Sequence, residues 1–192
     1  MNIIRKINEK ISLFLNFFAR NYNLQKIIWI FADLPIFFAP VFLVSAWIYF
    51  AIKNNDNKKK DLIFIFFSIL FSLLTNLVIQ HLVIERRPET FIKPLIDHLP
   101  DASFPSDHAV VSFSFLAWLY LFWYKRVFWI YLPFVIVMNI CRISAGVHWF
   151  FDVIVWMFIG IFWAFLFKKY SKNKVFDKIA NFFIKIAKFF ML

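Results

Sequence analysis

Apolar segments about as long as a lipid bilayer is thick recur along this chain, and they limit the possible folds more than any other feature. The runs from 27 to 52 and from 62 to 84 carry almost no charge, and a membrane-spanning helix needs about 20 such residues. Of 192 residues, 62% are hydrophobic, including 30 Phe and 8 Trp. A soluble domain of this size cannot bury so much apolar surface. We therefore predict an all-α integral membrane protein.

The apolar pattern predicts one domain, residues 1–192, with a bundle of five to six transmembrane helices. The first two spans cover 27–52 and 62–84, and a third covers 106–124. The stretch 127–167 is too long for one span and too apolar for a loop. Its centre, 139–152, is polar, and a charge held at mid-bilayer costs roughly 2.5–3.5 kcal/mol. We therefore place a tight turn there, between two further spans.

The two ends of the chain are predicted to be amphipathic helices at the membrane surface, because Lys and Arg alternate there with Ile and Phe. Residues 1–26 form an interfacial or re-entrant helix, 27–167 the transmembrane core, and 168–192 a basic tail. Thirteen Lys and Arg fall on the side of this tail and nine on the other side. The positive-inside rule predicts that the tail is cytoplasmic. The connection 85–105 and the turn near 142–148 then share the extracytoplasmic face.

Composition excludes several classes of function. The two glycines, Gly146 and Gly160, cannot build a glycine-rich nucleotide loop, and Cys141 alone can form neither an internal disulfide nor a multi-cysteine metal site. The net charge of +11 is distributed between apolar segments, which favours contact with anionic membrane lipids over nucleic acid. The four His lack zinc-ligand spacing. We expect no metal and no cofactor.

Three polar clusters fall on the predicted extracytoplasmic face: Arg87-Pro88, Pro105-Ser106-Asp107-His108, and Arg142 with His148 and Asp152. His148 and Asp152 are four residues apart, so on a helix they share one face. A carboxylate there can accept the imidazole Nδ1–H, which leaves Nε2 as a nucleophile or base. Taken alone, the pair is also compatible with an ordinary hydrogen bond on a helix surface.

The remaining members of these clusters suit a phosphate group. Arg87 and Arg142 offer planar forks for phosphate oxygens, although arginines also mark the headgroup boundary of a membrane. Ser106 follows a proline at a predicted helix start, where hydroxyl and free amides can face an anion; it can also be only a helix cap. His108 can give a proton to a leaving oxygen. Together these groups predict phosphoryl transfer without a metal.

These residues resemble the motifs of the type 2 phosphatidic acid phosphatase superfamily, which also includes vanadium haloperoxidases. The second motif, Pro-Ser-x-His, matches Pro105 to His108, and the third, Ser-Arg-x3-Gly-x-His-x3-Asp, matches Cys141 to Asp152. The first motif ends in Arg-Pro, matched by Arg87-Pro88. The stretches DASFPSDHA and RISAGVHW, with Leu34-Pro35, are most similar to bacterial undecaprenyl-diphosphatases of the bacitracin-resistance type.

The resemblance implies roles for individual residues. His148 attacks phosphorus and forms a phosphohistidine, Asp152 holds its tautomer, and His108 protonates the leaving lipid phosphate and then helps to activate water. Arg87, Arg142 and Ser106 bind the equatorial oxygens. The family has Lys where this chain has Gln80, so neutralisation of the phosphate falls to other groups such as Arg86 or Lys93. Gly146 belongs to the third motif, and Cys141 replaces its Ser.

The resemblance implies a lipid substrate, undecaprenyl diphosphate, hydrolysed at the extracytoplasmic face of a bacterial cytoplasmic membrane to recycle the carrier for envelope polysaccharide synthesis. Two alternatives stay open. The substrate can be another lipid with a terminal phosphate, such as phosphatidylglycerophosphate, phosphatidic acid or lipid A 1-phosphate. The chain can also be a scaffold or small transporter that catalyses nothing.

Overall fold

The computed structural model describes residues 3–83, 88, 91–97, 104, 106–122 and 124–189, and the regular elements within these ranges are all helical. This confirms the predicted all-α class. The elements are α1 (Ile3–Asn21), α2 (Gln25–Phe31), the 3₁₀ helix η1 (Leu34–Phe37), α3 (Phe38–Ile52), α4 (Asp56–Leu82), α5 (Asp107–Leu121), α6 (Lys125–Ser144), α7 (Phe150–Tyr170) and α8 (Lys174–Phe189).

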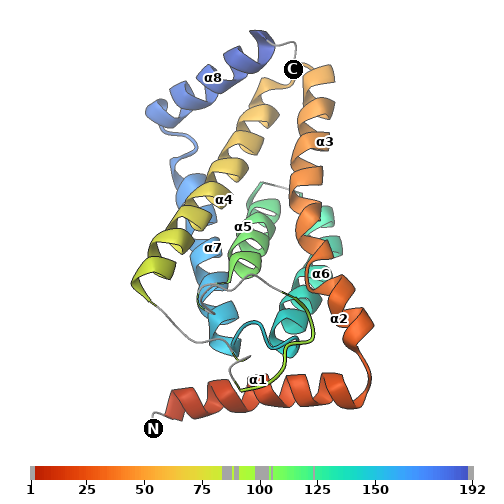
Figure 1. Cartoon of the computed structure of the whole chain (residues 1–192). Helices are drawn as coiled ribbons and strands as arrows, with labels where there is room; N and C mark the ends of the chain where they lie inside the picture. Colours follow the sequence, from red (N-terminus) through yellow and green to blue (C-terminus); the bar gives the residue numbers. More distant parts are fainter. Residues whose placement is uncertain are drawn as a thin grey trace.

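Four segments of the described chain are long and apolar enough to cross a membrane: Gln25–Ile52, Asp56–Leu82, Lys125–Ser144 and Phe150–Tyr170. The third predicted span, 106–124, corresponds to α5, which is also apolar but has only 15 residues. It lies at the centre of the bundle, where it contacts α4, α6 and α7 (Figure 1). The predicted break between the last two spans is confirmed, because α6 ends at Ser144 and α7 begins at Phe150.

The first span is not one continuous helix. It is interrupted at Ala32 and Asp33, between α2 and η1, and Pro35 lies in the first turn of η1. Proline lacks an amide hydrogen and disfavours helical geometry in the residue before it. The chain therefore changes direction here, which Figure 1 shows as the bend between α2 and α3. The interruption lies at the end of the bundle that also holds the turn between α6 and α7 (Figure 1).

Helices α5 and α7 approach each other closely at Gly160. A Cβ atom added at Gly160 would lie 2.5 Å from the carbonyl oxygen of Val110 and 2.8 Å from the amide nitrogen of Ser114. Both neighbours are backbone atoms of α5, so they cannot rotate away as a side chain can. The absence of a side chain at Gly160 sets the distance between the two helices that carry His108 and Asp152.

The terminal helices lie at opposite ends of the bundle (Figure 1). On α1, polar side chains face the protein, with Asn8, Ser12 and Asn16 buried, while Phe14 and Phe17 are exposed. This arrangement places the apolar face of α1 outward, as expected of a helix in the membrane interface. At the other end, α8 is joined to α4 by two ion pairs, each of 2.6 Å: Lys60 with Asp177, and Lys188 with Asp56.

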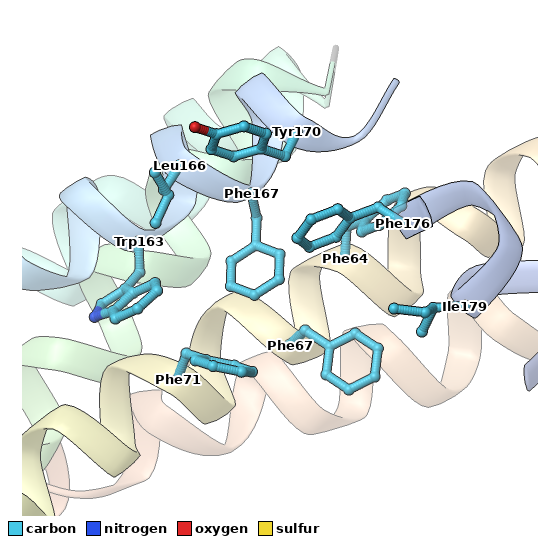
Figure 2. Close-up of a pocket in the computed structure, with 9 residues that line it drawn as sticks. All are labelled: Phe64, Phe67, Phe71, Trp163, Leu166, Phe167, Tyr170, Phe176 and Ile179. Atoms are coloured by element: carbon cyan, nitrogen blue, oxygen red, sulfur yellow. The ribbon is translucent and has the colours of Figure 1, made fainter. Parts of the chain in front are cut away.

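Aromatic side chains line a groove between α4, α7 and α8, with a cavity volume of about 540 Å³ (Figure 2). The side chains that line it are Phe64, Phe67, Phe71, Trp163, Leu166, Phe167, Tyr170, Phe176 and Ile179. These residues carry no charged group that could hold an anion. The groove therefore suits contact with lipid chains, and the polar chemistry of the molecule lies elsewhere.

Candidate active site

The turn between α6 and α7 brings Arg142 and His148 together. Arg142 lies in the last turn of α6, and His148 lies two residues before α7; both are buried. Arg142 Nη2 is 3.2 Å from His148 Nε2. A guanidinium group can only donate, so this contact requires Nε2 to accept and places the ring proton on Nδ1. This tautomer carries its lone pair on Nε2, as a nucleophilic histidine must.

Asp152 faces the other nitrogen of the same ring. His148 Nδ1 lies 4.0 Å from Asp152 Oδ2, and both side chains are almost fully buried. Asp152 is the third residue of α7, and its Oδ2 also accepts a 2.8 Å hydrogen bond from the Trp149 amide. Our expectation that His148 and Asp152 share one helix face is wrong, because α7 begins only at Phe150. The turn, held by the Trp149 bond, brings the two side chains together instead.

The start of α5 supplies the second imidazole. Ser106 is the residue immediately before α5 and is fully buried, but its hydroxyl makes no cap bond to the helix. Within the described residues this hydroxyl has no hydrogen-bond partner. A buried hydroxyl without a hydrogen-bond partner is destabilising, so a ligand that accepts a hydrogen bond from Ser106 would stabilise the site. His108, in the first turn of α5, directs Nε2 towards the carboxylate of Asp33.

Asp33 is the member of this cluster that the sequence analysis missed. Its Oδ1 lies 3.0 Å from His108 Nε2 and 2.5 Å from Arg142 Nη1. The cluster therefore forms one chain of contacts, from His108 through Asp33 and Arg142 to His148. A signal was present in the sequence, because Asp33 is the one charged residue between 27 and 52. An ionisable residue inside an apolar span is a candidate for function in its own right.

Four other predicted site residues have different outcomes. Arg86 and Arg87 lie outside the described residues, so their placement stays a prediction. Gln80 lies near the end of α4 and is half-buried. Gly146 lies in the turn before His148 with φ of +80°, and an added Cβ would lie 3.1 Å from Ile92 Cδ1. The positive φ explains why glycine suits this position.

Helix α1 supports the turn between α6 and α7 with side chains that the sequence analysis did not single out. Asn16 Nδ2 donates to the Ser144 carbonyl at 2.7 Å, at the end of α6. Ser12 Oγ accepts from the Phe150 amide at 3.0 Å, and Asn8 Oδ1 accepts from the Phe151 amide at 2.9 Å. The first amides of a helix lack partners within it. Asn8 and Ser12 therefore fix the start of α7 beside His148 and Asp152.

The sequence model of the PAP2 superfamily matches residues 61–176. This chain belongs to that superfamily. It is a multi-pass membrane protein and a phosphatase.

The chain is also similar to two relatives and to one solved structure. It is 29% identical to the "Bacitracin transport permease protein BcrC" of Bacillus licheniformis over 77% of this chain and 72% of the relative. It is 28% identical to the "Undecaprenyl-diphosphatase BcrC" of Bacillus subtilis over 67% of this chain and 65% of the relative. The fold is similar, with a TM-score of 0.73 and 21% identity, to the crystal structure of a transmembrane PAP2 type phosphatidylglycerolphosphate phosphatase from Bacillus subtilis, covering 91% of this chain and 89% of that one.

Proposed function

We propose that this protein hydrolyses undecaprenyl diphosphate to undecaprenyl phosphate and inorganic phosphate, through a phosphohistidine on His148. The observation that carries the proposal is the chain of contacts from His108 through Asp33 and Arg142 to His148. It connects a candidate acid and a candidate nucleophile through one cationic group: His148 contacts Arg142 directly, and His108 is linked to Arg142 through Asp33. The undecaprenyl-diphosphatase named among the relatives supports the choice of substrate.

In the first step, His148 Nε2 attacks the terminal phosphorus, and the bond from phosphorus to the bridging oxygen breaks. His108 gives its proton to that oxygen, so undecaprenyl phosphate leaves. Arg142, the Ser106 hydroxyl and Arg87 hold the three equatorial oxygens, where charge spreads in the transition state. In the second step, His108 accepts a proton from water, which attacks the phosphohistidine and releases phosphate. No step needs a metal.

An apolar groove beside Asp33 supports a lipid as the substrate. The groove, here called the η1–α6 groove, has a cavity volume of about 340 Å³ and is lined by Phe31, Leu34, Pro35, Phe38, Ile130, Tyr131 and Phe134. Leu34 directly follows Asp33 in the chain and Phe31 precedes it by two residues, so the groove begins next to the polar cluster. A prenyl chain can occupy such an apolar surface while its diphosphate reaches Arg142.

We propose that the site faces the extracytoplasmic side of a bacterial cytoplasmic membrane. The turn between α6 and α7, which holds Arg142 and His148, lies at the same end of the bundle as α1, while α8 and the turn between α3 and α4 lie at the other end (Figure 1). Among the described residues, the end with α8 holds thirteen Lys and Arg and the end with α1 holds seven. The positive-inside rule supports a cytoplasmic position for that end.

Phosphate release by the full chain in detergent tests this proposal. We expect release from undecaprenyl diphosphate, near-complete loss in His148→Ala and His108→Ala, and retention in His81→Ala. His81 is a matched control because it is exposed, in the last turn of α4, and bonds only to its own helix at Leu77 among the contacts described. Loss of activity in His81→Ala alone, or full activity in His148→Ala, would contradict the assigned roles.

A panel of lipids separates the alternatives. A strong preference for phosphatidylglycerophosphate, phosphatidic acid or lipid A 1-phosphate would reject undecaprenyl diphosphate as the substrate while leaving the mechanism in place. One relative is named a transport permease, and a permease needs a closed compartment. Release of phosphate in detergent, where no compartment exists, would favour an enzyme, and its absence from every lipid would favour a transporter or scaffold.

A further inference from the structure

The carboxylate of Asp33 lies where a phosphoryl oxygen is expected to bind. One oxygen atom, Oδ1, contacts donors from two helices: Arg142 Nη1 of α6 at 2.5 Å and His108 Nε2 of α5 at 3.0 Å. Under the proposed mechanism, these groups hold a phosphoryl oxygen and protonate the leaving oxygen. Carboxylate and phosphate oxygens accept the same charge-assisted bonds from such donors.

His108 Nε2 cannot serve Asp33 and a substrate oxygen at the same time, because it carries one hydrogen. Arg142 Nη1 carries two hydrogens, but a phosphate bound to the second would lie beside the Asp33 carboxylate, and two anions so close together repel each other. Arg142 Nη2 meanwhile contacts the nucleophilic Nε2 of His148. In this arrangement, both reactive nitrogens are engaged by other protein groups, so the structure describes a closed form of the site.

The Asp33 carboxylate can leave this position by rotation of its side chain alone. Its side chain is 47% exposed, whereas that of Arg142 is 9% exposed. The flanking backbone is fixed, because the Ala32 amide bonds to the Ile28 carbonyl at 2.8 Å and the Tyr131 hydroxyl bonds to the Pro35 carbonyl at 2.9 Å. The carboxylate can therefore turn towards solvent without a rearrangement of α2 or η1.

We propose that the Asp33 carboxylate competes with the substrate for the phosphate subsite. A terminal phosphate displaces the carboxylate from this subsite, whereas a phosphodiester does not. The inference rests on the proposed function. A terminal phosphate carries up to two negative charges and can outcompete a single carboxylate for Arg142. The headgroup phosphate of an ordinary phospholipid is a diester with one charge. Asp33 thus selects terminal phosphates within a membrane full of diesters.

Binding of inorganic phosphate and of dimethyl phosphate, a soluble diester, to the full chain in detergent tests this inference. If the Asp33 carboxylate occupies the subsite about nine-tenths of the time, the protein binds phosphate about tenfold more weakly than a protein whose subsite is always open. We expect Asp33→Asn and Asp33→Ala to bind phosphate about tenfold more tightly than the parent protein, and to bind dimethyl phosphate measurably where the parent does not. Using both variants guards against misfolding of one.

Two controls separate displacement from a general effect of charge. Asp97→Asn removes an exposed acid close to the turn, since the Leu95 amide bonds to the Ala145 carbonyl at 2.9 Å; we expect its phosphate affinity to stay within about twofold of the parent. At about 1 M NaCl the Debye length is about 3 Å, and the tightening in Asp33→Asn should persist there. An effect that disappears at this salt concentration, or matches that of Asp97→Asn, would overturn the inference.

The same binding data distinguish this inference from the proposed function. Suppose that Asp33→Asn binds phosphate more tightly but the parent protein does not hydrolyse undecaprenyl diphosphate. This result would reject undecaprenyl diphosphate as the substrate and support competition by Asp33. Suppose instead that the parent protein hydrolyses undecaprenyl diphosphate but Asp33→Asn binds phosphate equally or more weakly. This result would support the substrate and reject competition by Asp33. Asp33 would then be a group that supports His108 throughout the reaction.

Discussion

Replacing Gly160 with Ala sets two effects of opposite sign against each other. Alanine is favoured over glycine inside a helix by about 1 kcal/mol, which alone would stabilise α7. The added Cβ, however, would lie 2.5 Å from the Val110 carbonyl oxygen. An ordinary contact is nearly 1 Å longer, so α5 must move away from α7, and overpacking of this kind costs about 1–3 kcal/mol. Because both close neighbours are backbone atoms, the cost should lie in the upper part of this range, about 2–3 kcal/mol. We therefore expect a net loss of about 1–2 kcal/mol.

The displacement should also change the positions of the proposed catalytic groups, because α5 carries His108 and directly follows Ser106, while α7 carries Asp152. A misplacement of about 1 Å between reacting groups can lower the rate up to about a hundredfold. Thermal unfolding of the detergent-purified protein should show a melting temperature lower by about 2–8 °C, with kcat reduced more than KM is changed.

Val155→Ala is the matched control for this substitution. Val155 is exposed on the same helix, so the change should stay within about 0.5 kcal/mol. A Gly160→Ala protein with the stability and kcat of the parent would show that α5 and α7 do not touch at this position. The contact at Gly160 would then not set the distance between α5 and α7.

Three further outcomes are expected. The double variant Asn8→Ala/Ser12→Ala removes the acceptors for the Phe150 and Phe151 amides; it should lose about 1 kcal/mol per bond and lower kcat, whereas Lys10→Gln on the exposed side of α1 should do neither. Cys141→Ser, which restores the residue of the family motif, should keep full activity; its loss would show that the buried thiol matters. Hydrolysis should survive EDTA and be inhibited by vanadate, a mimic of pentavalent phosphorus; abolition by EDTA would contradict a mechanism without metal.

Local patterns in the sequence were enough to predict the main helices and part of the site. Apolar length predicted the spans, and the polar centre of 139–152 predicted the turn now seen between α6 and α7. The motif spacing singled out His108, Arg142 and His148, which the structure brings into one cluster through contacts of 3.2 Å or less.

Contacts between distant parts of the chain could not be predicted in this way. Asp33 and Arg142 are 109 residues apart, and Ser12 and Phe150 are 138 residues apart. Neither pair has a spacing rule, because each depends on how α1 and α2 pack against the end of α6. The alternation of Lys and Arg with Ile and Phe predicted only that residues 1–26 form an interfacial or re-entrant helix. In the structure, the polar side chains of α1 face the turn between α6 and α7, and its apolar side is exposed.

The most direct test of the central claim is to trap the covalent intermediate. The full chain is mixed rapidly with undecaprenyl diphosphate labelled in its terminal phosphate, quenched in alkali, which preserves phosphohistidine, and digested for mass spectrometry. We predict phosphate on Nε2 of His148 in the parent protein and no phosphohistidine in His148→Ala. Any phosphohistidine formed in His108→Ala should live longer than in the parent protein, because His108 helps to activate water in the second step. Steady turnover without any adduct on His148, or an adduct on another residue, would contradict the account.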